Sequence, residues 1–211
     1  MDSNGKFISF EGIDGSGKTT QIRLLKDRLQ ACEIPVLMIR EPGGTAVSEA
    51  IRDVLLDPSH VMMCAETELL LFAAARAQLT REVIKPALRA GTWVICDRFT
   101  DSTVAYQGFG RGFDPTKIER LNALATDGLA PERTFLITLS TAVCAERMDR
   151  RGEGTKNRLD QESRAFMNRV QKGYLTIAEQ AADRVVVLDG NRSPKVIADE
   201  IFNVIRKEFM E

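Results

Sequence analysis

The chain of 211 residues is poor in the residue types that build metal and disulfide sites. It has one histidine and four cysteines, and the cysteines stand far apart, without a C-x-x-C pair. That spacing argues against a zinc site and against a disulfide framework. No apolar run reaches the roughly 18 residues that a membrane-spanning helix needs, and the first residues lack the apolar core of a signal peptide. We therefore expect a cytoplasmic protein with no membrane partner.

The chain also lacks an excess of charge of either sign. Its 29 basic residues balance 30 acidic ones, and the formal net charge is −1. A polymer nucleic acid partner would need a basic surface, so the balance argues against one. Among the basic residues, however, 20 are arginine and 9 are lysine. Because arginine suits forked recognition of phosphate, the composition favours small phosphorylated ligands.

A phosphate-binding loop is the clearest motif. Residues 12–19, Gly-Ile-Asp-Gly-Ser-Gly-Lys-Thr, match G-x-x-x-x-G-K-[ST] between an apolar run and a helical pattern, which is the context that this motif needs. Its glycines let backbone N–H groups approach a phosphate, and the following helix adds its positive dipole end. Lys18 is predicted to contact the outer phosphates, and the Thr19 hydroxyl to bind Mg²⁺. A glycine-rich turn with a chance lysine is the alternative.

Short apolar segments alternate with helical patterns along the whole chain. The predicted strands cover residues 7–10, 34–39, 91–97, 134–139 and 185–189. This alternation predicts an α/β fold with a five-stranded parallel sheet and helices on both faces. The length favours a single domain, residues 1–211. Long helices are expected over 65–90, with a kink or break near Pro86, and over 161–181.

Ligands of such sheets bind beyond the carboxyl ends of the strands. Charged residues or glycines stand at those ends, notably the phosphate loop, Arg40-Glu41, Asp97-Arg98 and Asp189-Gly190. A separate segment around 147–160 is rich in arginine and holds two glycines. It is either the solvated end of a helix or a lid that covers phosphates.

Several motifs together resemble the thymidylate kinase family of the bacterial type. They are the phosphate loop with Thr20, Arg-Glu-Pro-Gly-Gly-Thr at 40–45, Phe-Ala-Ala-Ala-Arg at 72–76, Asp-Arg-Phe at 97–99 and Ala-Tyr-Gln-Gly at 105–108. The resemblance covers nearly the whole chain. It implies a P-loop nucleoside monophosphate kinase fold and a homodimer. It also implies transfer of the γ-phosphoryl group from ATP to dTMP with Mg²⁺, which gives dTDP for dTTP synthesis.

The acceptor phosphate has a second pKa of about 6, so it is already mostly a dianion and needs no general base. Cations must instead hold two anions in line. By resemblance, Lys18 faces the donor, Arg98 bridges both phosphates, Arg40 contacts the acceptor, and Arg151 reaches the transferred group from the lid. Compared with the usual pattern of the family, the lid is two residues longer, which leaves Arg147, Arg150 and Arg158 open as alternatives to Arg151.

The resemblance also assigns the two nucleotide sites. The predicted ATP-binding residues are Gly12, Ile13, Asp14, Gly15, Ser16, Gly17, Lys18, Thr19, Thr20, Arg147 and Arg192. The predicted dTMP-binding residues are Asp14, Arg40, Glu41, Phe72, Arg76, Arg98, Thr103, Tyr106 and Gln107. Thr19 and Asp97 are predicted to hold Mg²⁺, although Asp97 could instead orient Arg98.

Some of these roles have a physical reason of their own. Phe72 and Arg76 are four residues apart, on one helix face, where a ring can stack on thymine and a guanidinium can bind the base. A core phenylalanine beside a surface arginine is the alternative. Gln107 offers an amide that can read a base edge, and Tyr106 can hinder a 2′-hydroxyl. Asp14 can accept from a deoxyribose 3′-hydroxyl, or it can be a turn aspartate bonded to its own backbone.

Two other functions stay open from the sequence. A P-loop kinase of another small acceptor, such as another nucleotide, a nucleoside or a sugar acid, would share the loop. A non-nucleotide kinase would not need a stacking ring and a base-reading amide. A nucleotide-dependent switch protein would hydrolyse its nucleotide slowly and would make no phosphorylated small product. The basic lid segment favours phosphoryl transfer, because a lid excludes water from the reaction.

Overall fold

The computed structural model describes residues 5–150 and 157–211. Five parallel strands form one sheet in the order β2-β3-β1-β4-β5. The strands are β1 (Phe7–Glu11), β2 (Val36–Arg40), β3 (Trp93–Asp97), β4 (Arg133–Thr138) and β5 (Val185–Asp189). The predicted five-stranded parallel sheet is therefore confirmed.

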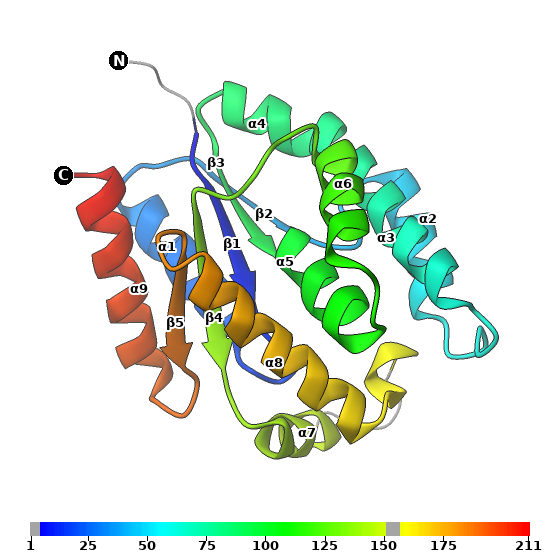
Figure 1. The fold of residues 1–211 in the computed structure, drawn as a ribbon. Coiled ribbons are helices and arrows are strands. Elements are labelled where there is room, and N and C mark those ends of the chain that lie inside the picture. The colour runs from blue at the N-terminus through cyan, green and yellow to red at the C-terminus, as the bar shows by residue number, and fades with distance from the viewer. Residues whose placement is uncertain (1–4, 151–156) are drawn as a thin grey trace.

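Helices connect the strands and cover both faces of the sheet (Figure 1). The α-helices are α1 (Lys18–Ala31), α2 (Ala46–Leu56), α3 (Ala65–Leu79), α4 (Lys85–Arg89), α5 (Thr100–Thr103), α6 (Pro115–Thr126), α7 (Thr141–Asp149), α8 (Arg164–Gln180) and α9 (Pro194–Phe209). Shorter turns are the π-helical η1 (Thr80–Ile84) and η2 (Val104–Gly110), and the 3₁₀ turn η4 (Leu159–Gln161).

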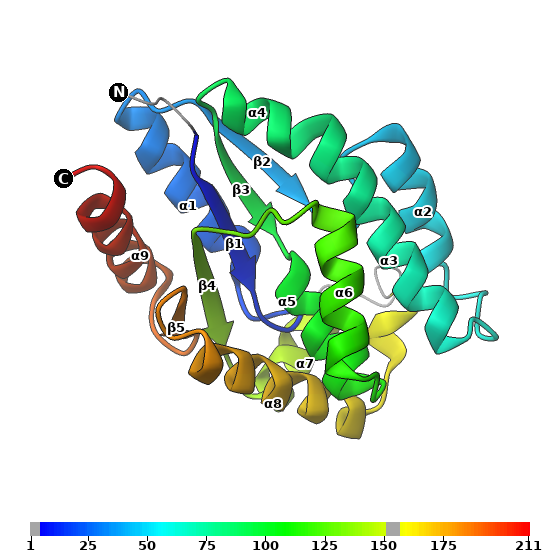
Figure 2. The same cartoon turned by 45° about the horizontal axis from the view of Figure 1, so that its top comes forward.

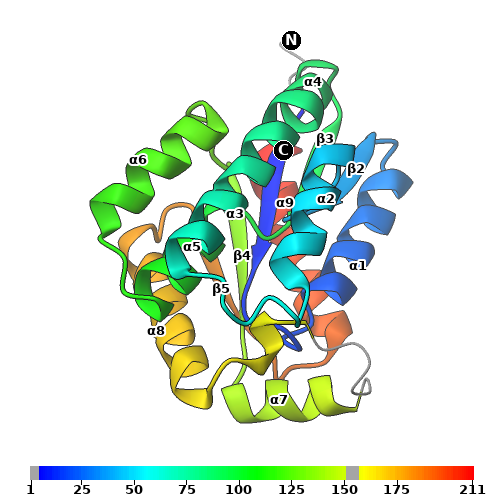
Figure 3. The same cartoon turned by 90° about the vertical axis from the view of Figure 1, so that its right-hand side faces the viewer.

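Alternate side chains of the central strands point to opposite faces of the sheet, and both faces are covered by apolar cores. Ile8, Phe10 and Ile95 face the side covered by α1 and α9, and all three are fully buried. On the other face, Phe7 and Val94 join the core beneath α3 and η1, and further side chains pack under α8. Figure 3 shows α1 and α9 on one side of the sheet and α3, α5, α6 and α8 on the other. Burial on both faces explains why β1 and β3 are nearly continuous apolar runs.

The carboxyl ends of all five strands point to one edge of the sheet (Figure 2). There the strand register places Asp97 beside both Phe10 of β1 and Arg40 of β2. The segment that follows β1 becomes the loop before α1, and the segment that follows β3 leads into α5. Residues far apart in the sequence therefore meet at this edge, as expected for a parallel sheet.

Among the predicted boundaries, the helical region over 65–90 with a kink or break near Pro86 is confirmed. It consists of α3, the π-helical turn η1 and the short helix α4, and Pro86 lies in the first turn of α4. There its missing N–H is harmless, because the first helical amides have no partner within their own helix. The helix expected over 161–181 begins later, at Arg164, where the Ser163 hydroxyl caps it. The second strand begins at Val36, two residues after Ile34.

No helix within the described parts of the chain is long and apolar enough to cross a membrane.

Candidate active site

Two hollows lie side by side at the carboxyl edge of the sheet. The larger is a cavity of about 410 Å³ bounded by α2, α3, η2 and the segment after β3. The smaller holds about 50 Å³ against the glycine loop, around Lys18 and Thr19. Asp14 and Asp97 line both hollows. The site therefore has two compartments that share one boundary.

The loop between β1 and α1 has a backbone that only glycine accommodates. Gly12, Gly15 and Gly17 all have left-handed φ angles, of 132°, 85° and 107°. A Cβ on Gly12 would stand 2.5 Å from the Ile137 carbonyl oxygen, and one on Gly15 would stand 2.7 Å from the Cys144 carbonyl oxygen. The loop is therefore pressed against the sheet and α7, with its amides available to an anion at the start of α1.

Lys18 lies against the loop that precedes it. Its Nζ donates to the carbonyl oxygens of Gly12 at 2.9 Å and Ile13 at 3.1 Å, and lies 3.6 Å from Asp14 Oδ1. Burial and the nearby charge of Arg98 lower the pKa of Lys18, which Asp14 opposes. The ammonium group thus stands at the smaller hollow, where it can meet a phosphate chain.

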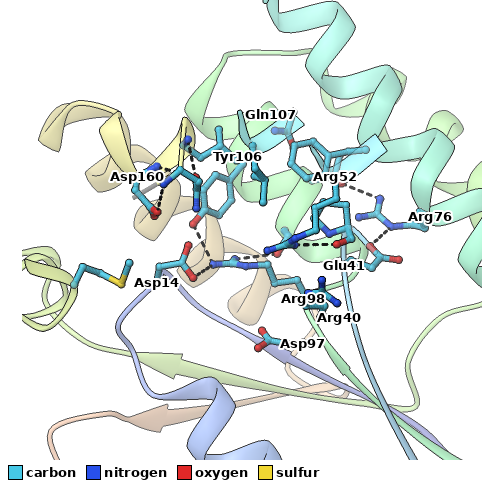
Figure 4. Close-up of a pocket in the computed structure, with 18 residues that line it drawn as sticks. Asp14, Arg40, Glu41, Arg52, Arg76, Asp97, Arg98, Tyr106, Gln107 and Asp160 are labelled. Atoms are coloured by element: carbon cyan, nitrogen blue, oxygen red, sulfur yellow. Dashed lines mark hydrogen bonds and ion pairs between the residues drawn. The ribbon is translucent and has the colours of Figure 1, made fainter. Parts of the chain in front are cut away.

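Arg98 lines the larger cavity next to Asp14, which borders both hollows (Figure 4). Its Nη2 donates to Asp14 Oδ1 at 2.9 Å, and its Nη1 donates to the Tyr174 hydroxyl at 3.1 Å. Burial alone would raise the pKa of Asp14, but the charges of Arg98 and Lys18 hold it well below its usual range. Two cations and one carboxylate therefore stand where the two hollows meet.

Thr19 and Asp97 face each other beside the smaller hollow. The Thr19 hydroxyl donates to Asp97 Oδ2 at 3.4 Å, and the Thr19 side chain is exposed. A hydroxyl and a carboxylate next to a phosphate loop are the oxygen ligands that Mg²⁺ takes. Within the described chain no cluster of three or more His, Cys, Asp or Glu side chains could hold a metal. The donor set therefore fits a Mg²⁺ ion that takes its remaining ligands from phosphates and water.

Arg76 is buried at the far end of the larger cavity, with its side chain only 2% exposed. Its guanidinium donates to Glu41 Oε2 at 2.7 Å, to the Thr103 hydroxyl at 2.8 Å, to Asn122 Oδ1 at 2.9 Å and to the Phe99 carbonyl oxygen at 3.0 Å. Four of its five N–H groups are thus used, and one on Nη2 is left. The alternative of a surface arginine is wrong.

Phe72 and Glu41 line the cavity beside Arg76. Phe72 is half-buried, which contradicts its alternative as a core side chain. Burial raises the pKa of Glu41 to about 6 against the opposing charge of Arg76. Its Oε1 is buried without a hydrogen-bond partner among the described residues. Thr103 also lines the cavity, and its hydroxyl accepts from Arg76 at 2.8 Å while its O–H can still donate.

Tyr106 and Gln107 follow each other in η2 and both line the cavity. The Tyr106 ring lies 5.2 Å from the Arg98 guanidinium carbon, and its hydroxyl accepts from Arg98 at 3.4 Å. Burial raises the pKa of Tyr106, so its phenol stays protonated. The Gln107 amide nitrogen donates to Glu68 Oε1 at 2.9 Å.

Arg40 is at the cavity mouth but already has a partner. Its two terminal nitrogens donate to Glu49 at 3.0 and 2.8 Å, and Glu49 also accepts from the Gly44 amide. Hydrogen bonding by Gly44, together with Arg40, lowers the pKa of Glu49. Arg40 is half-exposed, so this ion pair is weak and exchangeable.

The predicted ATP-side arginines lie in different surroundings. Arg147 of α7 donates to the Gly15 carbonyl oxygen at 3.2 Å, which places it directly on the glycine loop. Arg192 pairs with Glu200 on the surface, in the turn after β5. That turn approaches the loop closely, because a Cβ on Gly190 would lie 3.3 Å from the Ser16 carbonyl oxygen. Arg151 falls outside the described residues.

A buried acid network behind Arg98 was missed from the sequence. Glu11 accepts from the Phe99 amide at 2.7 Å, from the Ser102 hydroxyl at 2.6 Å and from the Tyr174 hydroxyl at 2.9 Å. Burial, aided by the charge of Asp101, raises the pKa of Glu11 to about 7. The glutamate at the end of an otherwise apolar strand could have indicated this buried network.

Arg52 and Glu68 were also missed. Arg52 of α2 lines the cavity near Arg40, where its Nη1 donates to the Pro42 carbonyl oxygen at 2.9 Å. Glu68 lies in the first turn of α3, where acidic residues are common, so the sequence around it did not indicate that it is buried. Its side chain is nevertheless 1% exposed.

This arrangement suits transfer of a charged group between two bound anions. The loop, Lys18 and the Thr19–Asp97 pair form an anion and metal site, and the larger cavity offers an aromatic face with polar side chains. Arg98 lines the larger cavity and donates to Asp14, which lines both hollows. No described side chain at the boundary is placed as a nucleophile activated by a base, which a phosphate acceptor would not require.

Comparison with known proteins gives a consistent family. A family model described as thymidylate kinase matches residues 10–201. Thymidylate kinase of Pelotomaculum thermopropionicum is 47% identical over 92% of this chain and 89% of its own length. That of Citrifermentans bemidjiense is 51% identical over 89% of this chain and 85% of its own length. The crystal structure of thymidylate kinase from Ehrlichia chaffeensis superposes with a TM-score of 0.77 at 35% identity, covering 96% of this chain and 99% of that one.

Proposed function

The chain belongs to the thymidylate kinase family, and from this premise we propose how its residues divide the reaction. The enzyme transfers the γ-phosphoryl group of ATP to dTMP with Mg²⁺, which yields dTDP. We assign one nucleotide to each hollow because the two hollows adjoin, and Asp14 and Asp97 line both of them. ATP phosphates occupy the smaller hollow at the glycine loop, and dTMP occupies the larger cavity.

Lys18 and Arg98 perform the electrostatic work of the transfer. The acceptor phosphate is mostly a dianion near pH 7, so the difficulty is to hold two anions in line. Lys18 neutralises the donor side, and Arg98 bridges donor and acceptor, because it lines the larger cavity and its guanidinium bonds Asp14, which lines both hollows. Asp14 holds Arg98 in that position and accepts from the 3′-hydroxyl of dTMP. Thr19 and Asp97 would hold a Mg²⁺ ion, which would neutralise charge on the phosphates.

The thymine end of dTMP lies between Phe72 and Arg76. Phe72 stacks on the base, and the remaining N–H of Arg76 donates to a base carbonyl. Glu41 and Thr103 serve this site indirectly, since both accept from Arg76. Tyr106 packs against the sugar, and Gln107 reads the base edge.

Arg40 and Arg52 are the cations for the acceptor phosphate. Arg40 must exchange its surface ion pair with Glu49 for the phosphate, which is inexpensive at a half-exposed position. Arg52 has only a carbonyl partner among the described residues, which leaves its remaining N–H groups for an anion. We assign Arg147 and Arg192 to ATP, and Arg151 to the transferred phosphoryl group.

The test is a coupled assay of ADP release with dTMP, dUMP, UMP, CMP, AMP and thymidine as separate acceptors. Conversion of dTMP far ahead of thymidine is expected, because the site supplies cations for a phosphate acceptor and no base for a hydroxyl. Loss of dTMP conversion alongside consumption of a different acceptor would overturn the function. ATP hydrolysis with no phosphorylated product would instead favour a switch protein.

We also propose a homodimer built on α2, α3 and α6. These helices lie together on one side of the molecule (Figure 3). They expose Val47 and Val54 from α2, Leu70 from α3 and Leu124 from α6, with exposed fractions of 43–72%. An apolar face of this kind is suited to a second copy of the chain. Leu124→Glu should shift the mass in light scattering from dimer to monomer, whereas Leu175→Glu on α8 should not. A wild-type monomer would exclude the dimer.

A cytoplasmic location and a single catalytic domain over residues 1–211 complete the proposal. All four cysteines are free thiols, which suits a reducing compartment. The family model spans residues from β1 to α9, which supports a single domain.

A further inference from the structure

Glu68 is the most heavily bonded buried carboxylate outside the residues assigned above. Its side chain is 1% exposed. Its Oε1 accepts from Gln107 Nε2 at 2.9 Å and Arg111 Nε at 3.1 Å, and its Oε2 accepts from Arg111 Nη2 and Arg158 Nη2 at 2.8 and 2.7 Å. Burial by itself would raise the pKa of Glu68, but these hydrogen bonds from Arg111, Gln107 and Arg158 lower it. The group is therefore an ionised carboxylate, which can only accept hydrogen bonds.

That restriction fixes the orientation of the Gln107 amide. An isolated glutamine can turn its amide over and present either the NH₂ group or the oxygen to a neighbour. Beside a carboxylate, the NH₂ group must point toward Glu68. The Gln107 oxygen, which accepts no hydrogen bond from the described residues, is then left for the cavity that this residue lines. Figure 4 shows Gln107 on the side of the cavity opposite Asp97.

An acceptor at this position distinguishes pyrimidines by their N3 atom. Thymine and uracil carry an N3–H donor, whereas cytosine carries an unprotonated N3 acceptor. A fixed amide oxygen therefore bonds thymine or uracil and opposes the lone pair of cytosine. We propose that Glu68 is a positioning residue that sets base specificity by holding the amide oxygen of Gln107 toward the base. The proposal rests on the assignment of dTMP to the larger cavity.

The same carboxylate secures a second wall of the cavity. Arg158 bonds Glu68 and also donates through Nε and its backbone N–H to the carbonyl oxygens of Leu55 and Leu56, at 2.9 and 3.0 Å. The next residues, Leu159 and Asp160, line the cavity. Glu68 thus ties the base-reading side chain and the wall after Arg158 to one point on α3, which keeps Gln107 from turning as the cavity fills.

The experiment compares kcat/KM for dTMP, dUMP and dCMP in wild type and Glu68→Gln. The glutamine at 68 can donate or accept, so the Gln107 amide is free to turn. We expect the dTMP/dCMP ratio to fall by ~10-fold or more, because a site built to bond one hydrogen-bonding pattern rejects another strongly. The dTMP/dUMP ratio should stay within about twofold, since both bases carry N3–H. Because each ratio is measured on one preparation, the fraction of folded enzyme cancels.

Glu162→Gln is the matched control. It removes the other carboxylate that pairs with Arg111, with the same change of charge, yet Glu162 does not touch Gln107. Its ratios should equal those of wild type. If Glu68→Gln gives no soluble protein, Glu68→Asp carries the same test, because it keeps the charge and withdraws it by one methylene from Gln107.

Three outcomes would overturn the proposal. They are an unchanged dTMP/dCMP ratio in the variant, an equal fall of both ratios, and an effect of Glu162→Gln as large as that of Glu68→Gln. An equal fall would indicate general loosening of the cavity. Wild-type enzyme that does not convert dTMP would instead contradict the proposed function itself, so the two failures are distinguishable.

Discussion

The two compartments of the site are built in different ways. The ATP side is formed mainly by backbone, in which three left-handed glycines and the start of α1 lie within one stretch of chain. The dTMP side is formed by side chains from α2, α3, η2 and the segments after β2 and β3, joined through Arg76, Glu41 and Glu68. A phosphate needs amides and charge, which one loop can supply. A base needs shape and a fixed donor–acceptor pattern, which requires side chains that are themselves held in place.

This difference predicts which substitutions disturb the fold. Thr19 is exposed at the smaller hollow, so its removal should affect ligands more than stability. Arg76 is buried and paired with a buried carboxylate. Removing one partner of such a pair typically costs ~3–5 kcal/mol, because a charge is left without compensation. On the dTMP side, therefore, binding and folding are carried by the same residues.

The substitution that tests the boundary most severely is Arg98→Ala. A transition-state arginine contributes roughly 10³-fold or more to turnover, so kcat should fall by at least ~10³-fold. The free energy of unfolding should change by less than the activation free energy of the transfer does, since Asp14 keeps Lys18 as a partner. Steady-state kinetics and urea unfolding measure the two effects. Near-normal turnover would remove Arg98 from the transfer and leave the two compartments without a shared cation.

The Arg98→Lys variant controls for charge alone. Lysine keeps one cation but cannot donate to Asp14 and Tyr174 at once with a planar fork. It should recover a small part of the lost turnover. Full recovery would mean that charge, rather than bridging geometry, is what the boundary requires.

The second-largest expected effect is the pH dependence of the free energy of unfolding that arises from the buried network behind Arg98. The pKa of Glu11 is about 7 in the fold, against 4.5 as its ordinary value. A raised carboxyl pKa means that the native state binds the proton more tightly than the unfolded chain. The stability it provides is fully present below pH 4.5 and is lost as pH rises to about 7. The shift corresponds to a loss on the order of 3 kcal/mol.

Glu11→Gln should abolish that response, because a glutamine does not ionise and can still accept from the Phe99 amide. Urea unfolding at several pH values between 4.5 and 8 should show wild type losing stability relative to the variant. Glu132→Gln provides the control, since Glu132 is a partly exposed surface carboxylate paired with Lys6. Parallel stability curves for wild type and Glu11→Gln would show that Glu11 ionises normally in the fold.

A smaller effect separates the compartments by their substrates. Phe72→Ala should raise KM for dTMP by ~5–150-fold, since stacking of a base on an aromatic ring contributes ~1–3 kcal/mol. KM for ATP should change less than about twofold, because Phe72 lines only the larger cavity. Phe72→Leu keeps apolar volume without a flat ring and should show an intermediate value. Equal increases in both KM values would contradict the separation of the sites.

The backbone-built compartment was predictable from the sequence, and so was the sheet. Glycines at fixed spacing before Lys18 indicate a phosphate-binding loop. The apolar runs at β1 and β3 reflect burial on both faces of the sheet. Helix boundaries were less predictable. The helix expected over 161–181 begins only at Arg164, where the Ser163 hydroxyl caps it, and the 3₁₀ turn η4 lies before it.

For the side-chain-built compartment, the sequence predicted which residues line the site but not the partners that hold them in place. The motifs identified Arg76 and Gln107, but their partners Asn122 and Glu68 lie 46 and 39 residues away in the sequence. A glutamate in the first turn of a helix is typical of exposed positions, so nothing local indicates that Glu68 is buried. Which carboxylate meets which cation is decided by how α3 and η2 pack, and this information is spread over the whole chain.

The smallest expected effect lies on the exposed rim of the ATP side, at Arg192. Its side chain is 41% exposed and pairs with Glu200. An exposed cation in water contributes at most ~1 kcal/mol to an interaction, so Arg192→Ala should raise KM for ATP by less than about fivefold and leave KM for dTMP unchanged. Arg206→Ala is the control, because Arg206 is exposed on α9, the helix that carries Glu200, and pairs with Glu211. An increase of ~30-fold or more in KM for ATP would show that adenine binding depends on a fixed side chain. The ATP side would then share the construction of the dTMP side, and the contrast between backbone-built and side-chain-built compartments would hold only for the phosphates.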